Sequence, residues 1–175
     1  MKTLFTILVG VAALTQLSSC NKKDDPESPA TTLEITVKDG NSWSPSNTAL
    51  SNSSGVTINL YATQTDVTNK TPQYTATTNQ AGVASIPVEF KNQYLLTAQK
   101  GNAKNTINGL LIIGIFQTQT EINSAPFQTP VPSVGSPKFL DTNQDGRIDA
   151  GDRVIADIVN PILNQNVAKT IIIYQ

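Results

Sequence analysis

The sequence predicts an all-β fold, an antiparallel β-sandwich that forms a single domain over residues 32–175. Apolar and polar residues alternate in most of this region, which is the pattern of strands with one face on a core. The alternating segments recur at intervals of about ten residues, Gly, Asn and Pro lie between them, and no long segment has a helical period. This length suits one domain, which buries about two-thirds of its unfolded surface.

The first two strands follow from the alternation alone. Leu33, Ile35 and Val37 mark the first strand, and the second is predicted over residues 56–62. The segment between them, GNSWSPSNTALSNSSG, is rich in Gly, Ser, Asn and Pro, so it predicts a long connection with several turns.

The next three strands are predicted over residues 73–78, 83–90 and 93–99. The segment NQAG joins the first two of these strands, and its Gly82 can supply a positive φ for a tight turn. The third strand ends at KGN, another turn sequence.

The C-terminal part is less regular. Residues 110–116 form a continuous apolar run of seven, short enough for a strand buried on both faces, and the last strand is predicted over residues 170–174. Between them, residues 154–159 have apolar positions at the spacing of a short helix, which Pro161 would limit. A short strand fits the same residues, so both interpretations remain open.

Aromatic residues divide into two predicted groups. Phe90, Tyr94 and Phe116 are expected in the core, whereas Tyr61 and Tyr74 are expected to project outward from strands.

The N-terminus has the pattern of an export signal over residues 1–19. A positive start at Lys2 precedes an apolar stretch and a run of small residues. The sequence LSSC at its end resembles the lipobox of bacterial lipoproteins, which implies cleavage before Cys20 and lipidation of this residue. Cys20 is the only cysteine, and acylation explains a lone thiol in an exported chain. Residues 20–31 are charged, then rich in Pro, Ser and Thr, and predict a flexible tether.

The start of the tether, CNKKDD, resembles the signal that sends lipoproteins of Bacteroidota to the outer face of the outer membrane. A solvated spacer explains the same residues, and these two interpretations remain open. The resemblance implies an outer-membrane lipoprotein exposed at the cell surface, with a periplasm-facing position as the alternative.

The segment 141–152, DTNQDGRIDAGD, carries oxygen ligands at the spacing of a calcium loop. Ca²⁺ takes six to eight oxygens at about 2.3–2.6 Å, and one short segment can wrap around it when these oxygens fall at loop positions one, three, five, seven, nine and twelve. The residues at these positions are Asp141, Asn143, Asp145, Arg147 through its backbone carbonyl, Asp149 and Asp152, with Gly146 at the turning position six and Ile148 expected to point inward.

An alternative to a calcium loop is an acidic surface turn whose side chains bond their own backbone. Four of the thirteen acidic residues lie within these twelve positions, however, and such crowding of like charge is costly without a cation. The loop resembles the calcium loops of dockerin repeats, where Asp rather than Glu closes the loop. Dockerins carry two such loops and this chain has one, so docking onto a cohesin is not expected. The run KFLDTNQDGRIDAGDRVI is also similar to loops of surface receptors and lipoproteins of glycan-foraging Bacteroidota.

Residues 33–101 resemble the transthyretin-like, carboxypeptidase-regulatory-like modules of bacterial surface proteins. The residues that carry this resemblance are Thr77, Thr78, Asn79, Gly82, Val83 and Ala84, followed by Tyr94, Leu96, Ala98, Lys100 and Gly101. Asn79 stands where Asp is commoner in the pattern. The resemblance implies an immunoglobulin-like or transthyretin-like sandwich with the calcium loop inserted before the last strand, and it specifies a fold far better than a function.

The composition argues against catalysis and against nucleic-acid binding. The chain contains no histidine, which removes the usual catalytic base and zinc ligand. The net charge is −1 without a Lys/Arg cluster, and no Gly-rich phosphate loop occurs. The acids outside the loop and the tether are sparse: Glu34, Asp39, Asp66, Glu89, Glu121 and Asp157.

The expected function is therefore non-enzymatic, that of a lipid-anchored interaction module of the cell envelope with a structural Ca²⁺. Its partner would be an envelope protein or a glycan. The alternative is a carbohydrate-binding accessory lipoprotein of a glycan-uptake system, in which Trp43 stacks on a sugar. A loop Trp more often covers the end of a sandwich than binds a ligand, so this interpretation of Trp43 is favoured.

Overall fold

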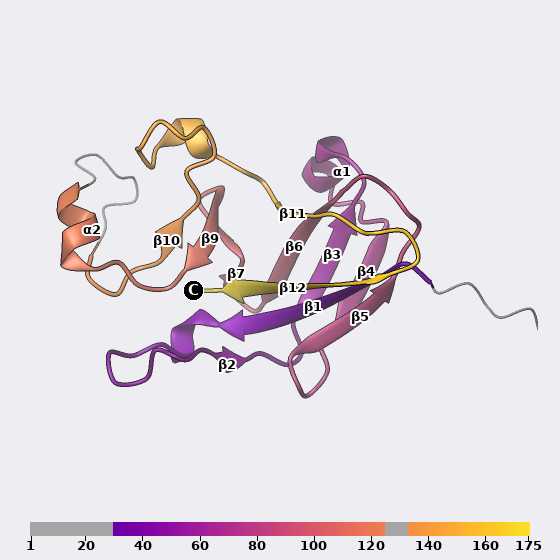
Figure 1. Cartoon of the computed structure of the whole chain (residues 1–175), viewed down its shortest axis with the longest axis horizontal. Coiled ribbons are helices and arrows are strands. Elements are labelled where there is room, and N and C mark those ends of the chain that lie inside the picture. Colours follow the sequence, from indigo (N-terminus) through magenta and orange to yellow (C-terminus); the bar gives the residue numbers. More distant parts are fainter. Residues whose placement is uncertain (1–29, 125–132) are drawn as a thin grey trace, which may run out of the picture.

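The computed structural model describes residues 30–124 and 133–175. These residues form an all-β, sandwich-like fold of two facing sheets, with a third small sheet at one end (Figure 1). In these two ranges, no helix is long and apolar enough to cross a membrane. The predicted signal peptide, Cys20 and nearly all of the tether lie outside the described residues.

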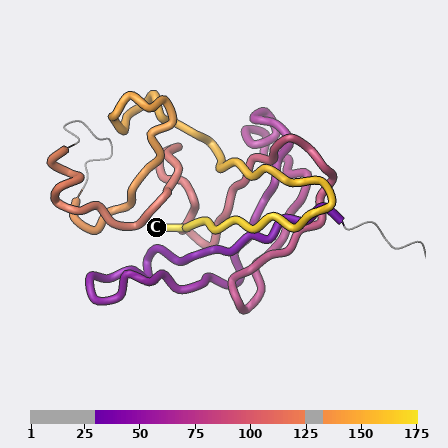
Figure 2. Tube along the Cα trace, in the orientation of Figure 1, coloured from indigo at the N-terminus to yellow at the C-terminus, as the bar shows by residue number. Residues whose placement is uncertain are grey.

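The first sheet is built around its central strand, β1. Its strands are β1 (Thr32–Asp39), β2 (Ser51–Asn52), β5 (Val83–Pro87) and β12 (Asn166–Ile173). Antiparallel β5 and β2 pair with one edge of β1, whereas β12 pairs with the other edge in parallel along eight residues (Figure 2). Among the paired strands of residues 30–124 and 133–175, this is the one parallel pair. Parallel neighbours need a crossover, and here nearly the whole domain lies between the two strands.

The second sheet is antiparallel, in the order β11, β6, β3, β4, with β7 beside the end of β6. Its strands are β3 (Thr57–Tyr61), β4 (Tyr74–Thr77), β6 (Tyr94–Lys100), β7 (Ala103–Lys104) and β11 (Asp157–Val159). The helix α1 (Gln64–Asn69) joins β3 to β4, and a capping box of Thr63 and Asp66 begins it.

The two sheets bury one common core between them. Alternate side chains of each strand contribute to it, as the period of two requires. The core residues from the first sheet include Leu33, Ile35, Val37, Ala84, Ile86, Ile171 and Ile173, and those from the second include Ile58, Leu60, Tyr94, Leu96, Ala98 and Val159. Seven of these, among them Leu33 and Tyr94, are completely inaccessible to solvent.

The third sheet belongs to a small lobe, which we define as residues 106–124 and 133–152. Its elements are β8 (Thr106–Ile107), β9 (Leu110–Gly114), α2 (Gln119–Ser124), β10 (Lys138–Phe139) and the 3₁₀ turn η2 (Ala150–Asp152); a second 3₁₀ turn, η1 (Gly40–Ser42), follows β1 in the sandwich. The lobe has its own apolar cluster of Leu110, Ile112 and Phe139, against which Ile107, Ile148, Ile172 and Tyr174 pack. Ile172 and Tyr174 come from β12 and its end, so one strand supplies both cores.

Most of the predicted strands are confirmed, with bounds shifted by a few residues. The open choice after the calcium loop resolves to a strand, because β11 occupies Asp157–Val159 and pairs with β6. The loop therefore precedes the last two strands rather than the last one alone. The final strand is longer than expected and begins at Asn166, because its first half pairs with β1 although it lacks strong alternation.

Several expectations about single elements were wrong. Helix α1 was not foreseen. The strand predicted over 110–116 ends at Gly114, and Ile113 is 54% exposed, so this strand is not buried on both faces. Phe90 is 50% exposed rather than in the core, because the chain leaves β5 at Pro87 and the alternation stops there.

The other aromatics also differ from expectation, apart from Tyr94. Tyr61 does not project outward: it is 4% exposed and packs in a cluster with Val67 of α1. Tyr74 packs partly buried against the sandwich core. Phe116 is 38% exposed, because it lies beyond the end of β9.

Leu33→Ala should destabilise the domain by about 2–5 kcal/mol, because the site is completely buried and the surrounding β-structure cannot collapse into the gap. The matched control is Leu163→Ala, at a side chain that is 55% exposed, which should change stability by less than about 0.5 kcal/mol. Urea unfolding followed by circular dichroism measures both. Equal losses for the two variants would contradict the assignment of the core.

Candidate functional site

The segment 141–152 forms a compact loop between β10 and β11 that ends in η2. Two positions in it have left-handed backbone, Gln144 with φ of 57° and Gly146 with φ of 79°. Left-handed backbone at Gly146 is the conformation that a sharp turn at loop position six requires, and glycine adopts it at little cost.

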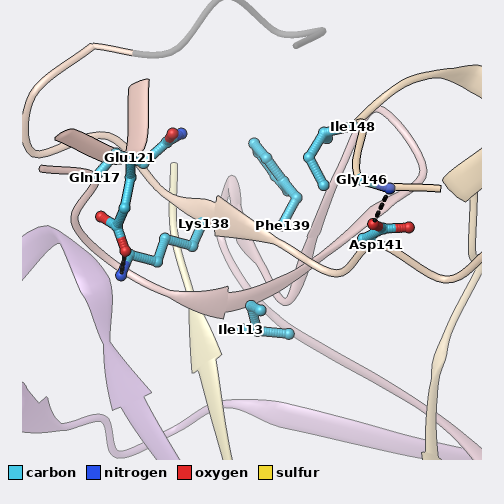
Figure 3. A pocket seen from close by; sticks show the side chains of 8 residues that line it. All are labelled: Ile113, Gln117, Glu121, Lys138, Phe139, Asp141, Gly146 and Ile148. Carbon is cyan, nitrogen blue, oxygen red and sulfur yellow. Dashed lines mark hydrogen bonds and ion pairs between the residues drawn. The ribbon is translucent and has the colours of Figure 1, made fainter. Parts of the chain in front are cut away.

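Side chains in the first half of the loop bond to the backbone ahead of them. Asp141 Oδ2 accepts from the backbone N–H of Gly146 at 2.9 Å, which closes the first half of the loop (Figure 3). Asn143 Oδ1 accepts from the N–H of Asp145 at 3.1 Å, and Asp145 Oδ1 accepts from the N–H of Arg147 at 2.8 Å. These Asx turns curl the backbone and place positions one, three and five along the inside of one turn.

Asp152 joins the two ends of the loop. Its Oδ1 accepts from the backbone N–H of Thr142 at 3.1 Å and from that of Asn143 at 3.4 Å, and its Oδ2 accepts from the N–H of Asp149 at 2.8 Å. Asp149 in turn accepts from the N–H of Gly151 at 2.7 Å. The structure thus brings the predicted ligands together in one loop, with position twelve at its centre.

The loop contains one fully buried carboxylate and one buried oxygen atom that has no hydrogen-bond partner in the described ranges. Asp152 is 0% exposed, so its carboxylate is fully removed from solvent. Asp141 Oδ1 is buried without a hydrogen-bond partner among the described residues. Buried carboxylates need compensation, and buried polar atoms are nearly always paired. A cation between these oxygens would compensate the buried charge of Asp152 and would give Oδ1 of Asp141 a partner.

The carboxylates of the described residues do not already form a cluster of three or more that could hold an ion. In the loop, Asp141, Asp145 and Asp149 each direct one oxygen to a backbone N–H instead. A calcium loop also draws on an amide and a backbone carbonyl, and a carboxylate oxygen that accepts one N–H keeps a second lone pair. The residues therefore fit Ca²⁺ in type and order.

Ile148 ties the loop to the small lobe. As expected from its loop position, its side chain is turned inward and packs partly buried against the cluster of Leu110, Ile112 and Phe139. The conformation of the loop and the packing of the lobe are therefore coupled through this one side chain.

A pocket of about 240 Å³ opens beside the loop (Figure 3). Its walls combine apolar side chains with a charged pair, and the lining residues are Ile113, Gln117, Glu121, Lys138, Phe139, Asp141, Gly146 and Ile148. Sequence reasoning did not find this pocket, because its residues come from four separate segments. One local pattern, Thr118 three residues before Glu121, could have indicated the start of α2, since the two residues bond reciprocally there.

Glu121 is the pocket residue with the strongest electrostatic perturbation. The hydrogen bond from the Lys138 ammonium, followed by bonds from Thr118, lowers the pKa of Glu121 from its ordinary 4.5 to about 2. Lys138 also lies over the ring of Phe116, 5.2 Å from its centroid. The pair holds α2 against β10.

Trp43 lies at the same end of the molecule and is partly buried against neighbouring residues. Its ring stacks on Phe116 with centroids 5.9 Å apart and planes 19° apart. A Cβ at Gly135 would lie 2.7 Å from an atom of the Trp43 ring, so the glycine backbone lies close to the ring. The Trp43 indole nitrogen is buried without a hydrogen-bond partner among the described residues. These contacts favour the interpretation of Trp43 as a cap of the sandwich, rather than the alternative that it stacks on a sugar.

No family model, curated protein or solved structure matches this chain.

Lys138→Met should raise the pKa of Glu121 from about 2 toward 4.5, with a remaining depression from the Thr118 bonds. Because the pKa of Glu121 is lower in the folded than in the unfolded chain, its ionised carboxylate stabilises the fold. This stabilisation is complete above pH 4.5 and is lost as the pH falls toward 2. NMR titration of the Glu121 carboxyl carbon measures the shift. Lys169→Met, at the ion pair with Asp157, is the control and should leave the pKa of Glu121 unchanged.

Proposed function

We propose that the chain is a non-enzymatic, lipid-anchored interaction module of the bacterial cell envelope in which loop 141–152 binds one structural Ca²⁺. The observation that carries the calcium part is the buried, unpartnered Oδ1 of Asp141 in a loop already curled by its own Asx residues. The lipid anchor is supported by the lipobox-like sequence that ends at Cys20.

The role of the ion follows from the place of the loop. The loop connects β10 of the small lobe to β11 of the second sheet, and Ile148 fastens it to the apolar cluster of the lobe. A bound Ca²⁺ would neutralise the crowded carboxylates and fix this connection, so that the lobe and its pocket keep one shape.

An interaction role accounts better for these features than a reaction does. The chain has no histidine to act as a base, and the pocket carboxylate Glu121 is committed to Lys138 and Thr118. Its low pKa makes Glu121 a poor proton acceptor near neutral pH. The pocket instead offers apolar walls and fixed charges, which suit binding of an envelope protein or a glycan.

Calcium should raise the melting temperature, and chelation should lower it. With a Kd near 10⁻⁴ M and about 1 mM calcium, linkage gives roughly 1.4 kcal/mol of stabilisation. Asp145→Ala should abolish this response while the sandwich stays folded, because the side chain is exposed. Thr142→Ala is the matched control in the same loop and should keep the response, since only its backbone N–H takes part in the loop contacts. Differential scanning calorimetry with and without calcium tests this; an unchanged melting curve together with no calcium bound in titration would refute the site.

Cys20→Ala should release the protein from bacterial membranes, because the acyl chains would have no attachment point and each buried methylene contributes about 0.8 kcal/mol to anchorage. Ser19→Ala keeps a small residue before the cysteine and should leave the protein in the membrane fraction. Membrane fractionation followed by an alkaline wash compares the two. Release of the unsubstituted protein by the wash would contradict the anchor.

A further inference from the structure

Three exposed apolar side chains lie in the two loops next to the start of the described chain. Phe90 is 50% exposed in the loop after β5, and Ile162 and Leu163, in the turn between β11 and β12, are 49% and 55% exposed. An exposed patch of large apolar side chains marks a surface that contacts another protein or a membrane. We call these three residues the apolar tip.

Hydrogen bonds hold both loops of the apolar tip to Thr31, the second described residue. The Thr31 carbonyl accepts from the N–H of Val88 at 2.9 Å, and the Thr31 hydroxyl oxygen accepts from the N–H of Asn164 at 2.9 Å. The side-chain amide of Asn160 also donates to the carbonyl of Asn92 at 2.9 Å, which joins the two loops directly. Figure 1 shows this end of the sandwich, where β1 begins and β11 turns into β12, opposite the end that carries β9, β10 and α2.

The tether limits how far this end can move from the lipid anchor. Only about ten residues separate Cys20 from Ala30, and a fully extended chain of this length reaches at most about 35 Å. A flexible chain of ten residues has a typical end-to-end distance of roughly 17–19 Å. An acylated Cys20 therefore keeps the apolar tip near the bilayer, whereas the small lobe lies at the far end of the domain.

We propose that the apolar tip docks onto the lipid bilayer that holds the anchor, with Phe90, Ile162 and Leu163 in the interfacial region. This inference rests on the proposed lipidation of Cys20. The contact is apolar rather than ionic, because Glu89 and Lys91 flank Phe90 with opposite charges. Such a contact resists salt, whereas attraction of a basic patch to anionic lipid would weaken with ionic strength. Docking fixes the domain upright, with the calcium loop and the pocket pointing away from the membrane.

The test uses the full acylated chain, purified from bacterial membranes and reconstituted into phosphatidylcholine vesicles. Because Cys20 is the only cysteine and its thiol would be blocked, Ile162→Cys introduces one reactive thiol, which takes an environment-sensitive fluorescent dye. The matched control is Val134→Cys, at an apolar side chain that is 65% exposed in the small lobe. Both substitutions are at exposed positions, so both variants should fold.

The dye at residue 162 should emit at a shorter wavelength when the acylated chain is on vesicles than when the domain has been cut enzymatically from its anchor and is free in buffer. Quenchers attached to the lipid chains should also reduce the fluorescence of this dye. The dye at residue 134 should show neither effect, and 0.5 M salt should leave the difference intact.

The outcomes separate this inference from the anchor itself. Flotation of the chain with vesicles but without a blue shift or quenching at residue 162 would overturn docking and leave the anchor standing. Equal quenching at residues 162 and 134 would also overturn it, because the domain would then lie on the membrane without a preferred end. Failure of the unsubstituted chain to float would overturn the anchor, and docking with it.

Discussion

The alternation of side chains along β12 is the constraint on which the rest of the structure depends. Successive residues of a strand point to opposite faces, so Ile171 and Ile173 enter the sandwich core while Ile172 and Tyr174 enter the small lobe. The same strand pairs with β1 along its full length. Full burial of Ile171 and Ile173 contributes roughly 1.5–3 kcal/mol each, whereas Ile172 and Tyr174 are partly buried in the lobe. One strand therefore packs into both cores and links them.

Because of this arrangement, the loop 141–152 helps to hold the small lobe against the sandwich. The loop carries the chain out of the small lobe and back to the second sheet, and the lobe's own apolar cluster is far smaller than that of the sandwich. Elements with few buried apolar contacts open locally at lower free energy than a large core does. We therefore expect the proposed ion to matter most for the lobe, with the sandwich folding largely through its own packing.

The two ends of the molecule are also chemically different. One end holds the start of β1 and the exposed side chains Phe90, Ile162 and Leu163, next to the proposed lipid anchor. The other end holds the loop 141–152, the pocket with its pair of Glu121 and Lys138, and the ring of Trp43 stacked on Phe116. Under our proposals, the end with Phe90, Ile162 and Leu163 would rest on the membrane, and the end with the pocket and the calcium loop would face away from it.

The sequence by itself determined the sheet-forming segments and the identity of the loop residues. Leu33, Ile35 and Val37 show their buried face directly, because the period of a strand is local and each second residue reports the same environment. The order of oxygen-bearing residues from Asp141 to Asp152 is likewise a local property, since all of them lie within one segment of twelve residues.

Only the tertiary structure decided which residues meet across the chain. Three contacts join segments that are far apart in sequence and share no periodic signal: the parallel pairing of β1 with β12, the clustering of Tyr61 with Leu95 and Ala156, and the stacking of Phe116 on Trp43. The pocket that unites Glu121 with Lys138 has the same origin. Local alternation specifies that a face is buried, whereas the partner of that face depends on how the sheets, the lobe and the connecting loops fill space together.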